Sequence, residues 1–168
     1  MPPVPFRHGE GLGTRKTRCM ILARSPIVLD TNILLDLFVF ADPLAAPLRQ
    51  QLDAGALDWI ATPPMREELD RVLAYPQIVP RMAYYQRSHA EVLAFFDAGA
   101  RLVAPAPKAV VTCKDADDQK FIDLAVAHQA QLLSKDRAVL CMKKRLLPWG
   151  VRVGACVLAP SLNGDGAV

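Results

Sequence analysis

The amino-acid sequence predicts an α/β fold in which a parallel sheet is flanked by helices. Short apolar segments alternate with segments of helical periodicity, and the connections between them are short. Two apolar runs, 27–29 and 132–133, lead into polar residues at the strand ends, which is typical of strands buried on both faces of a parallel sheet. The 168 residues suffice for one domain with a substantial core.

Prolines, a glycine and a capping residue delimit the elements of the first half of the chain. Pro43 ends the first helix, because proline lacks an N–H and its ring clashes with the preceding turn. Gly55 ends the second helix, Thr62 before two prolines begins the third, and Pro76 follows its end. The predicted order is strand, helix, helix, strand and helix, at residues 26–30, 33–40, 44–53, 57–61 and 65–74.

The second half of the chain continues the alternation. The first element is one long amphipathic helix, which Gly99 ends. A proline-rich loop at 105–107 follows, and the acidic run 115–118 opens the next helix. The predicted order is helix, strand, helix, strand and strand, at residues 80–96, 102–104, 115–129, 131–134 and 151–158.

The ends of the chain differ from its centre. Residues 1–24 contain three prolines, three glycines and five Lys or Arg residues without a periodic apolar pattern, which predicts a disordered basic tail. Met20 stands almost directly before the first strand, so a chain that starts there is the alternative interpretation. We expect the folded domain to span residues 25–160, followed by a C-terminal tail at 161–168.

Composition argues against a membrane span, a secreted protein and a zinc site. The chain is 52% hydrophobic with a mean hydropathy of +0.17, but polar residues interrupt its longest apolar stretch, 27–41, which is too short for a bilayer. No secretory signal is recognisable. No cysteines have CxxC spacing, so we expect reduced thiols in a cytoplasmic protein. The four are Cys19, Cys113, Cys141 and Cys156.

The net charge of +3 permits nucleic-acid binding without requiring it. Five cations crowd into a short stretch, at Lys135, Arg137, Lys143, Lys144 and Arg145. Charge alone supports two interpretations of this stretch equally. It is either a surface that holds a phosphate backbone or a solvated helix face with lysines near its end.

Two aspartates stand where predicted parallel strands end. Asp30 follows the apolar run 27–29, and Asp136 closely follows the run 132–133. The carboxyl ends of the strands are where open α/β sheets build their sites. The simpler interpretation is that each aspartate caps the helix that follows it. Ser134, between the second run and Asp136, has a hydroxyl that could bond a carboxylate or a phosphate.

Glu68 is expected to face the protein body. In the predicted helix 65–74, helical spacing places Glu68 beside Met65 and Val72 at the edge of the apolar stripe, whereas Glu67 falls on the opposite face. The alternative is a half-buried glutamate that pairs with a neighbouring arginine, Arg66 or Arg71. The presence of the other acidic residues favours a functional role for Glu68.

Asp118 is expected to be buried as well. Phe121, Ile122 and Ala125 follow it at helical spacing, so Asp118 falls in the middle of a buried stripe, where a carboxylate is unfavourable unless it is paired or binds a metal. Asp115 shares its side of the helix and is expected to assist it. The helix macrodipole accounts for the other acids of the run.

Four converging carboxylates would repel one another, and a divalent metal ion relieves that repulsion. Oxygen ligands select Mg²⁺ or Mn²⁺ over zinc. Such an ion lowers the pKa of a bound water and neutralises charge on a scissile phosphate. No histidine is placed to act as a general base without a metal. The four acids therefore predict phosphodiester hydrolysis by metal-activated water.

At this point the sequence resembles the PIN domain family of metal-dependent ribonucleases, and within it the toxin components of toxin–antitoxin pairs. The resemblance covers residues 26–160, and the sequence LDTN at 29–32 is its most specific element. The other matching segments are Glu68-Leu69 with Val72-Leu73, residues 113–118 with Phe121, and residues 132–136.

The resemblance implies a three-layer α/β/α sandwich and endonucleolytic cleavage of single-stranded RNA with Mg²⁺ or Mn²⁺. It assigns catalysis to four acids, three of which hold the metal: Asp30, Asp118 and Asp136, with Glu68 as the fourth. The residues expected to orient them or the substrate are Asn32, Ser134, Asp115 and Lys135. It also implies a cognate antitoxin and a homodimer. Members often carry a second acid two residues beyond the last aspartate, where this chain has Ala138.

Two other functions remain as alternatives. A phosphatase of the haloacid-dehalogenase kind would need a second aspartate two residues after Asp30, and Asn32 stands there. A non-catalytic PIN-fold module that binds RNA or a protein would need no metal, and the presence of all four acids argues against it.

Overall fold

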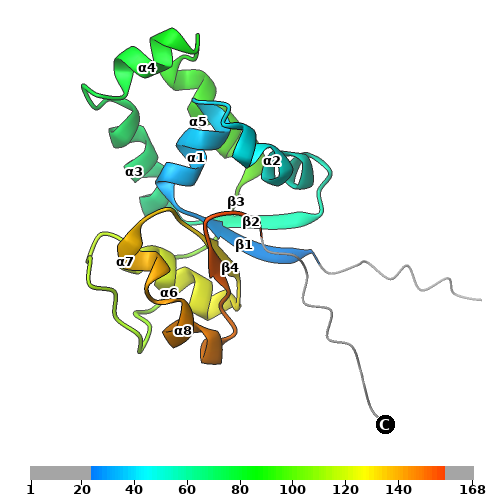
Figure 1. The fold of residues 1–168 in the computed structure, drawn as a ribbon, viewed down its shortest axis with the longest axis vertical. Helices are drawn as coiled ribbons and strands as arrows, with labels where there is room; N and C mark the ends of the chain where they lie inside the picture. Colours follow the sequence, from blue (N-terminus) through cyan, green and yellow to red (C-terminus); the bar gives the residue numbers. More distant parts are fainter. Residues whose placement is uncertain (1–23, 158–168) are drawn as a thin grey trace, which may run out of the picture.

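The computed structural model describes residues 24–157 and contains one five-stranded parallel sheet (Figure 1). The strand order is β3-β2-β1-β4-β5, and every neighbouring pair is parallel. The predicted tails, residues 1–24 and 161–168, lie outside the described residues apart from Arg24. The strands are β1 (Ser25–Leu29), β2 (Leu57–Ala61), β3 (Arg101–Leu102), β4 (Gln131–Leu133) and β5 (Val153–Gly154).

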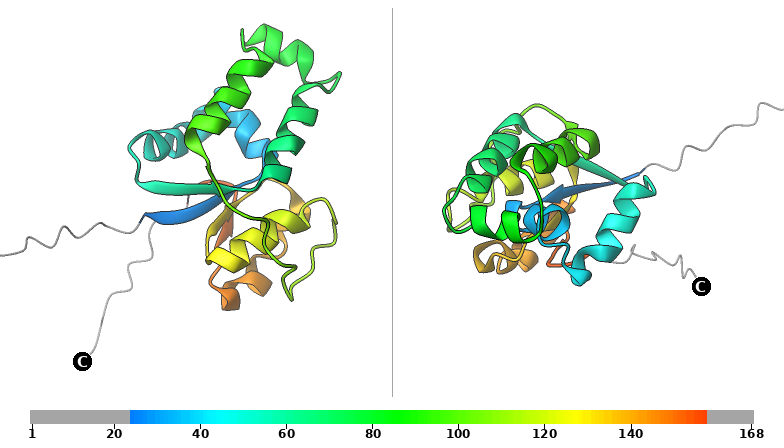
Figure 2. Two further views of the ribbon diagram at one scale, coloured as in Figure 1. Left: turned by 180° about the vertical axis from the view of Figure 1, so that it is seen from behind. Right: turned by 90° about the horizontal axis from the view of Figure 1, so that it is seen from above.

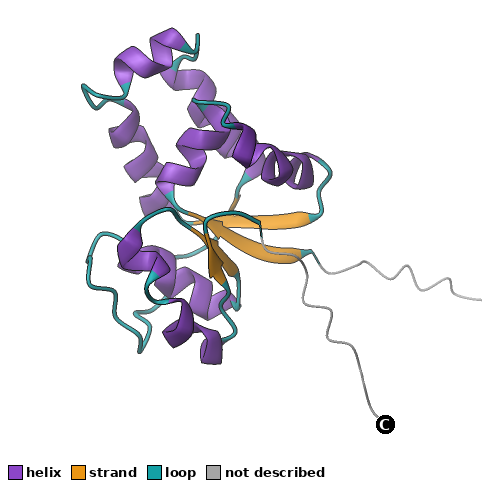
Figure 3. Cartoon of the chain, in the orientation of Figure 1, coloured by secondary structure: helices purple, strands orange, loops and turns teal. Residues whose placement is uncertain are grey.

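Helices cover both faces of the sheet, as Figures 1 and 2 show. One side carries α1 (Thr31–Phe38), α2 (Ala46–Asp53), α3 (Pro63–Leu73), α4 (Val79–Tyr84) and α5 (His89–Gly99). The other side carries α6 (Gln119–His128), α7 (Arg137–Leu140) and α8 (Lys143–Leu146). Two short 3₁₀ helices, η1 (Pro43–Ala45) and η2 (Leu147–Trp149), complete the described elements. The predicted three-layer α/β/α sandwich is confirmed (Figure 3).

The central strands are buried on both faces, as their continuous apolar runs predict. Ile27, Val28, Leu132 and Leu133 have no exposed surface. In the register of the two strands, Leu29 lies opposite Leu133. The residues that follow these two leucines therefore leave the sheet side by side, at the edge formed by the carboxyl ends of the strands.

The predicted long helix 80–96 is wrong, because the chain forms two helices there, α4 and α5. Gln86 adopts a left-handed conformation (φ 53°), which a right-handed helix cannot continue. Ser88 then caps α5 with a reciprocal pair of bonds. Its hydroxyl accepts from the Glu91 N–H at 3.1 Å, and its own N–H donates to the Glu91 carboxylate at 2.8 Å. The Ser-x-x-Glu spacing of this capping box is visible in the sequence.

Helix α6 begins at Gln119 and not at residue 115. The Asp115 carboxylate accepts the N–H of Asp117 at 2.9 Å, which stabilises a turn in place of a first helical turn. The last strand is also shorter than predicted, since only Val153–Gly154 of residues 151–157 pair with β4. Helices α7 and α8 stand in a stretch to which the sequence assigned no element.

No single helix within residues 24–157 is both long and apolar enough to cross a membrane, although α1 and the segment Pro43–Asp53 pass that test as a pair bent by 104°. The three cysteines of this part of the chain are free thiols. Cys113 is buried, and Cys141 and Cys156 are exposed.

Candidate functional site

The ends of β1 and β4 bring Asp30, Ser134 and Asp136 together. The Asp30 N–H donates to the carbonyl of Leu133 at 3.0 Å, which extends the β1–β4 ladder by one residue. The Ser134 hydroxyl donates to Asp30 Oδ2 at 2.6 Å and accepts the Asp136 N–H at 3.0 Å. The Asp136 carboxylate caps α7 by accepting the Ala138 N–H at 2.7 Å. The serine hydroxyl thus links the two predicted strand-end acids.

Helix α3, which lies in the same helical layer as α1, places Glu68 at the same edge of the sheet. As predicted, Glu67 is exposed and Glu68 is half-buried. The Thr31 hydroxyl donates to Glu68 Oε1 at 2.9 Å, and the Lys120 ammonium forms an ion pair with Glu68 Oε2. Glu68 is thus half-buried and ion-paired, as the alternative interpretation expected, but its observed partner is Lys120 and not Arg66 or Arg71, and Arg66 binds Asp97 instead. Glu68 therefore joins α3 to the first residue of α1 and to α6.

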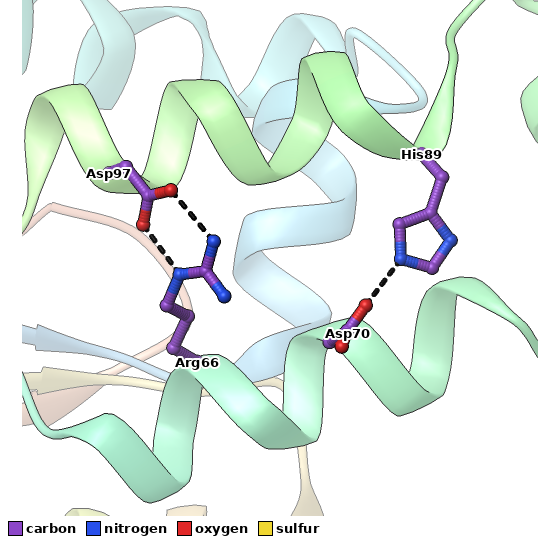
Figure 4. Close-up of polar contacts among 4 residues, drawn as sticks. All are labelled: Arg66, Asp70, His89 and Asp97. Atoms are coloured by element: carbon purple, nitrogen blue, oxygen red, sulfur yellow. Dashed lines mark hydrogen bonds and ion pairs between the residues drawn. The ribbon is translucent and has the colours of Figure 1, made fainter.

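Two polar contacts join α3 to α5 (Figure 4). Arg66 donates from Nε and Nη2 to the Asp97 carboxylate, at 2.5 and 2.7 Å. One turn further along α3, Asp70 Oδ1 lies 2.5 Å from His89 Nε2. Glu68 is placed between these two contacts in the sequence and turns the other way, toward the sheet edge.

Asp118 lies immediately before α6 and is the least satisfied side chain of the site. It is 9% exposed, its side chain makes no capping bond, and Oδ2 is buried without a hydrogen-bond partner. Burial, together with the negative charges of Asp30, Asp136 and Asp115, raises the pKa of Asp118 from 3.8 to about 7, and the positive charge of Lys120 opposes this rise. An unpaired buried carboxylate is unfavourable unless a proton or a cation neutralises it.

Asp30 is buried more completely, with 4% of its surface exposed. Burial raises its pKa, and hydrogen bonds from the Ser134 hydroxyl and the Thr31 backbone oppose that rise. The charges of Glu68 and Asp136 also raise the pKa of Asp30. The four predicted acids therefore share one electrostatic environment, although they come from four separate segments.

A cavity of about 250 Å³ opens at this edge of the sheet. Three acids, Asp30, Glu68 and Asp118, line one part of it, and Asn32 is exposed at its wall. The remaining wall comes from α1, α3 and the segment after α3: Thr31, Leu35, Val72, Tyr75, Gln77 and Ile78. Ser134 and Asp136 do not line the cavity. Ser134 bonds to the lining residue Asp30, and Asp136 bonds to Ser134. We call this cavity the acidic pocket.

Two predicted residues lie apart from the acidic pocket. Asp115 is exposed in the turn before α6, and only its charge reaches Asp118. The Lys135 ammonium forms ion pairs with Asp36 and, at 3.6 Å, with Asp42. Lys135 and these two aspartates line a different cavity, of about 200 Å³, between α1, η1 and β4.

The sequence did not single out three residues of the pocket wall, Thr31, Tyr75 and Gln77, or Lys120, which pairs with Glu68 beside the pocket. Thr31 lies within the LDTN sequence but was not given a role. Lys120 stands two residues after Asp118, with no local pattern that indicates its partner. Tyr75 is 43% exposed and lies in the connection between α3 and α4, where sequence periodicity carries no information.

The pocket fits a hydrated hard cation in the chemistry of its donors. Within residues 24–157, no three acidic, histidine or cysteine side chains stand together as a ready-made metal group. Mg²⁺, however, usually keeps several waters and takes only one or two carboxylates from a protein. Asp30 and Asp118 offer oxygen donors only, and the unpartnered Asp118 Oδ2 is an oxygen that such an ion would satisfy.

Comparisons with known proteins agree with this architecture. The structure of VapBC2 from Rickettsia felis bound to a DNA fragment from their promoter is similar in fold, with a TM-score of 0.52 and 12% identity over 77% of this chain and 97% of that chain. No curated protein sequence matches the chain. The family model described as PIN domain matches residues 26–138, which include Asp30, Glu68, Asp118 and Asp136. The chain therefore belongs to the PIN domain family.

Proposed function

We propose that this chain is an endoribonuclease that hydrolyses phosphodiesters of single-stranded RNA at the acidic pocket with Mg²⁺ or Mn²⁺. The observation that carries the proposal is the Asp118 carboxylate, which is buried beside other acids with Oδ2 lacking a partner. Membership of the PIN domain family and the oxygen-only donors of the pocket support it.

The metal is assigned to Asp30 and Asp118, with Asp136 as the third acid. When bound, Mg²⁺ or Mn²⁺ lowers the pKa of a water and offsets the charge that develops on the scissile phosphate. The Ser134 hydroxyl holds Asp30 Oδ2, and Asp136 holds Ser134 through its N–H, so these two residues fix the direction of the Asp30 carboxylate. Burial of Asp30 and Asp118 excludes competing water from their oxygens.

The wall of the acidic pocket offers contacts for a nucleotide. Asn32 presents an exposed amide at the carboxylates, and Tyr75 presents a partly exposed ring. Bases of single strands stack on such rings because every base has an aromatic face. Lys143, Lys144 and Arg145 are exposed on α8 and are available to a phosphate backbone. Lys135 has no role in this proposal, because Asp36 and Asp42 hold its ammonium.

A toxin role with a cognate antitoxin is the second part of the proposal. It rests on the family and on the likeness in fold to a protein of the VapBC2 complex. The free thiols of Cys113, Cys141 and Cys156 suit a reducing compartment such as the cytoplasm. Co-expression with the product of the adjacent gene should yield a complex that blocks RNA cleavage, and a homodimer should appear in light scattering of the free chain.

The test is cleavage of a labelled single-stranded RNA by the purified full chain in Mn²⁺, in Mg²⁺ and in EDTA, with Asp30→Asn and Asp118→Asn as variants. We expect cleavage that needs the metal and is lost in both variants. Equal cleavage by wild type and variants would place the activity elsewhere. Failure to bind Mn²⁺ together with no cleavage would favour the alternative, a non-catalytic module that binds RNA or protein.

A further inference from the structure

Lys120 places a positive charge beside the acidic pocket, where it pairs with the lining residue Glu68. Its ammonium pairs with Glu68 Oε2, donates to the carbonyl of Asp117 at 2.5 Å and lies 4.9 Å from the centre of the Phe121 ring. Only 28% of the side chain is exposed. Contacts to three groups therefore hold the ammonium in place, while part of the side chain stays exposed to solvent.

Glu68 on α3 and Asp118 just before α6 differ in what their oxygens can still accept. Glu68 Oε1 takes the Thr31 hydroxyl, and Oε2 takes the Lys120 ammonium. Asp118 Oδ2, by contrast, is buried without a partner. A cation that enters the pocket finds an unused oxygen on Asp118, whereas at Glu68 it must first displace a bound hydroxyl or ammonium group.

We propose that the Lys120 ammonium occupies the place of a second metal ion, so that the pocket binds one divalent cation and Lys120 supplies the other positive charge to the RNA phosphate. The inference rests on the proposed metal-dependent function and adds the number of metal ions and a phosphate-positioning residue. With Glu68 neutralised by Lys120, three aspartates are left for the metal: Asp30, Asp118 and Asp136. One divalent ion offsets two of their three negative charges.

A second divalent ion would have to separate Lys120 from Glu68. No further acid assists it at Ala138, two residues beyond Asp136. A lysine ammonium is a compact point charge that commonly binds phosphate oxygens, so Lys120 can exchange Glu68 for the phosphate of a substrate that enters the neighbouring pocket.

The experiment measures Mn²⁺ binding to the full chain by calorimetry and by the loss of the free Mn²⁺ electron paramagnetic resonance signal. The proteins are wild type, Lys120→Met, Lys120→Arg and the exposed control Lys108→Met. We expect one Mn²⁺ per chain in wild type, Lys120→Arg and Lys108→Met. We expect two Mn²⁺ ions per chain in Lys120→Met, because removal of the ammonium leaves Glu68 Oε2 and the negative charge of Glu68 unpaired.

RNA binding supplies a second readout. KM for single-stranded RNA should rise about tenfold in Lys120→Met, because a contact to an ionised group is lost, and Lys120→Arg should restore most of it. Lys120→Gln replaces the methionine variant if the latter melts below the wild type by circular dichroism.

The outcomes separate the inference from the proposed function. One Mn²⁺ in Lys120→Met with unchanged affinity, or two in wild type, overturns the role of Lys120 and leaves the metal-dependent nuclease intact. No Mn²⁺ bound by wild type at millimolar concentration overturns both.

Discussion

Within residues 24–157, each edge of the parallel sheet has a buried side-chain oxygen without a hydrogen-bond partner. At the carboxyl edge it belongs to the ionisable carboxyl group of Asp118, and at the amino edge it belongs to the neutral amide of Gln131, the first residue of β4. At the carboxyl edge, the acidic pocket holds a buried carboxylate oxygen without a partner, and the pKa values of Asp30 and Asp118 are raised. At the amino edge, a cavity of about 400 Å³ lies beside the start of β2, and its aromatic rings are packed against one another. Phe38 stacks on Trp59 and Phe95, with ring centres 5.9 and 5.4 Å apart.

Arg49, which also lines the cavity at the amino edge, has its charge paired. The Arg49 guanidinium lies 5.3 Å from the ring centres of both Phe38 and Phe95, and Nε donates to the Asp53 carboxylate at 3.1 and 3.2 Å. This domain therefore concentrates aromatic packing and paired charge at the amino edge of the sheet and unpaired negative charge at the carboxyl edge. Natural proteins accept such local instability at functional sites.

Trp59→Ala should have the largest effect on stability and little effect on the site. Trp59 is 2% exposed and contacts Phe38 and Phe96, so its truncation should lower the free energy of unfolding by about 3–5 kcal/mol. Urea denaturation measures the change. Trp149→Ala, at a residue 42% exposed, is the matched control and should change stability by less than about 1 kcal/mol. Equal effects of the two variants would contradict the assignment of the amino edge to stability.

Asp118→Asn should have the opposite effects to Trp59→Ala, with a large loss of activity and no loss of stability. Metal-dependent cleavage should fall at least about a hundredfold, since the loss of about 3 kcal/mol of transition-state stabilisation has that effect on a rate. The melting temperature of the metal-free protein should not fall, because the amide removes a buried charge that other carboxylates repel. Asp117→Asn, in the neighbouring exposed residue, is the control and should retain activity. A marked loss of stability in Asp118→Asn would mean that this carboxylate has a structural partner.

The pH dependence of stability should carry the same signature. The pKa of Asp118 is about 7 in the folded chain against an ordinary value of 3.8, so the folded state holds this proton more tightly than the unfolded state. The stabilisation is complete below pH 3.8 and is lost as the pH rises through about 7. The melting temperature of metal-free wild type should therefore fall between pH 4 and 7 more steeply than that of Asp118→Asn. Parallel profiles would rule out Asp118 as the titrating group.

Gly99→Ala probes how tightly the amino edge is packed. A Cβ at residue 99 would lie 2.9 Å from Cζ3 of the Trp59 ring, which is too close unless the ring moves. Forced overpacking of this kind should lower the free energy of unfolding by about 1–3 kcal/mol. A smaller effect of Gly99→Ala in a Trp59→Phe background than in the wild-type background would confirm the contact. Wild-type stability of Gly99→Ala would show that the ring has room to shift.

Arg66→Ala should have the smallest effect, because the side chains of the Arg66–Asp97 pair (Figure 4) are partly exposed, at 34% and 48%. Exposed ion pairs contribute about 0.2–1 kcal/mol, and a double-mutant cycle with Asp97→Ala measures the interaction. The coupling should weaken at high salt. A coupling well above this range would mean that the orientation of α3, and with it Glu68, depends on this one contact.

The sequence predicted the sheet because burial on both faces leaves a mark in the local pattern. The predicted strand at 57–61 has the bounds of β2, and the runs in β1 and β4 were recognisable from continuous apolar residues. The orientation of Glu68 could be predicted because helical periodicity separates it from Glu67. The sequence also contains a signal that divides 80–96 into two helices, the capping box of Ser88 and Glu91. The amphipathic periodicity of the segment instead predicted one continuous helix.

By itself, then, the sequence determined the layers of this protein and the segments that carry its four acids. Only the tertiary structure decided which side chains satisfy them, since Ser134 and Asp30 are 104 residues apart and Thr31 and Glu68 are 37 apart. Lys120 at Glu68 and Lys135 at Asp36 were decided in the same way. The physical reason is that periodicity reports how a residue faces its own element, whereas a hydrogen bond or ion pair depends on how separate elements pack.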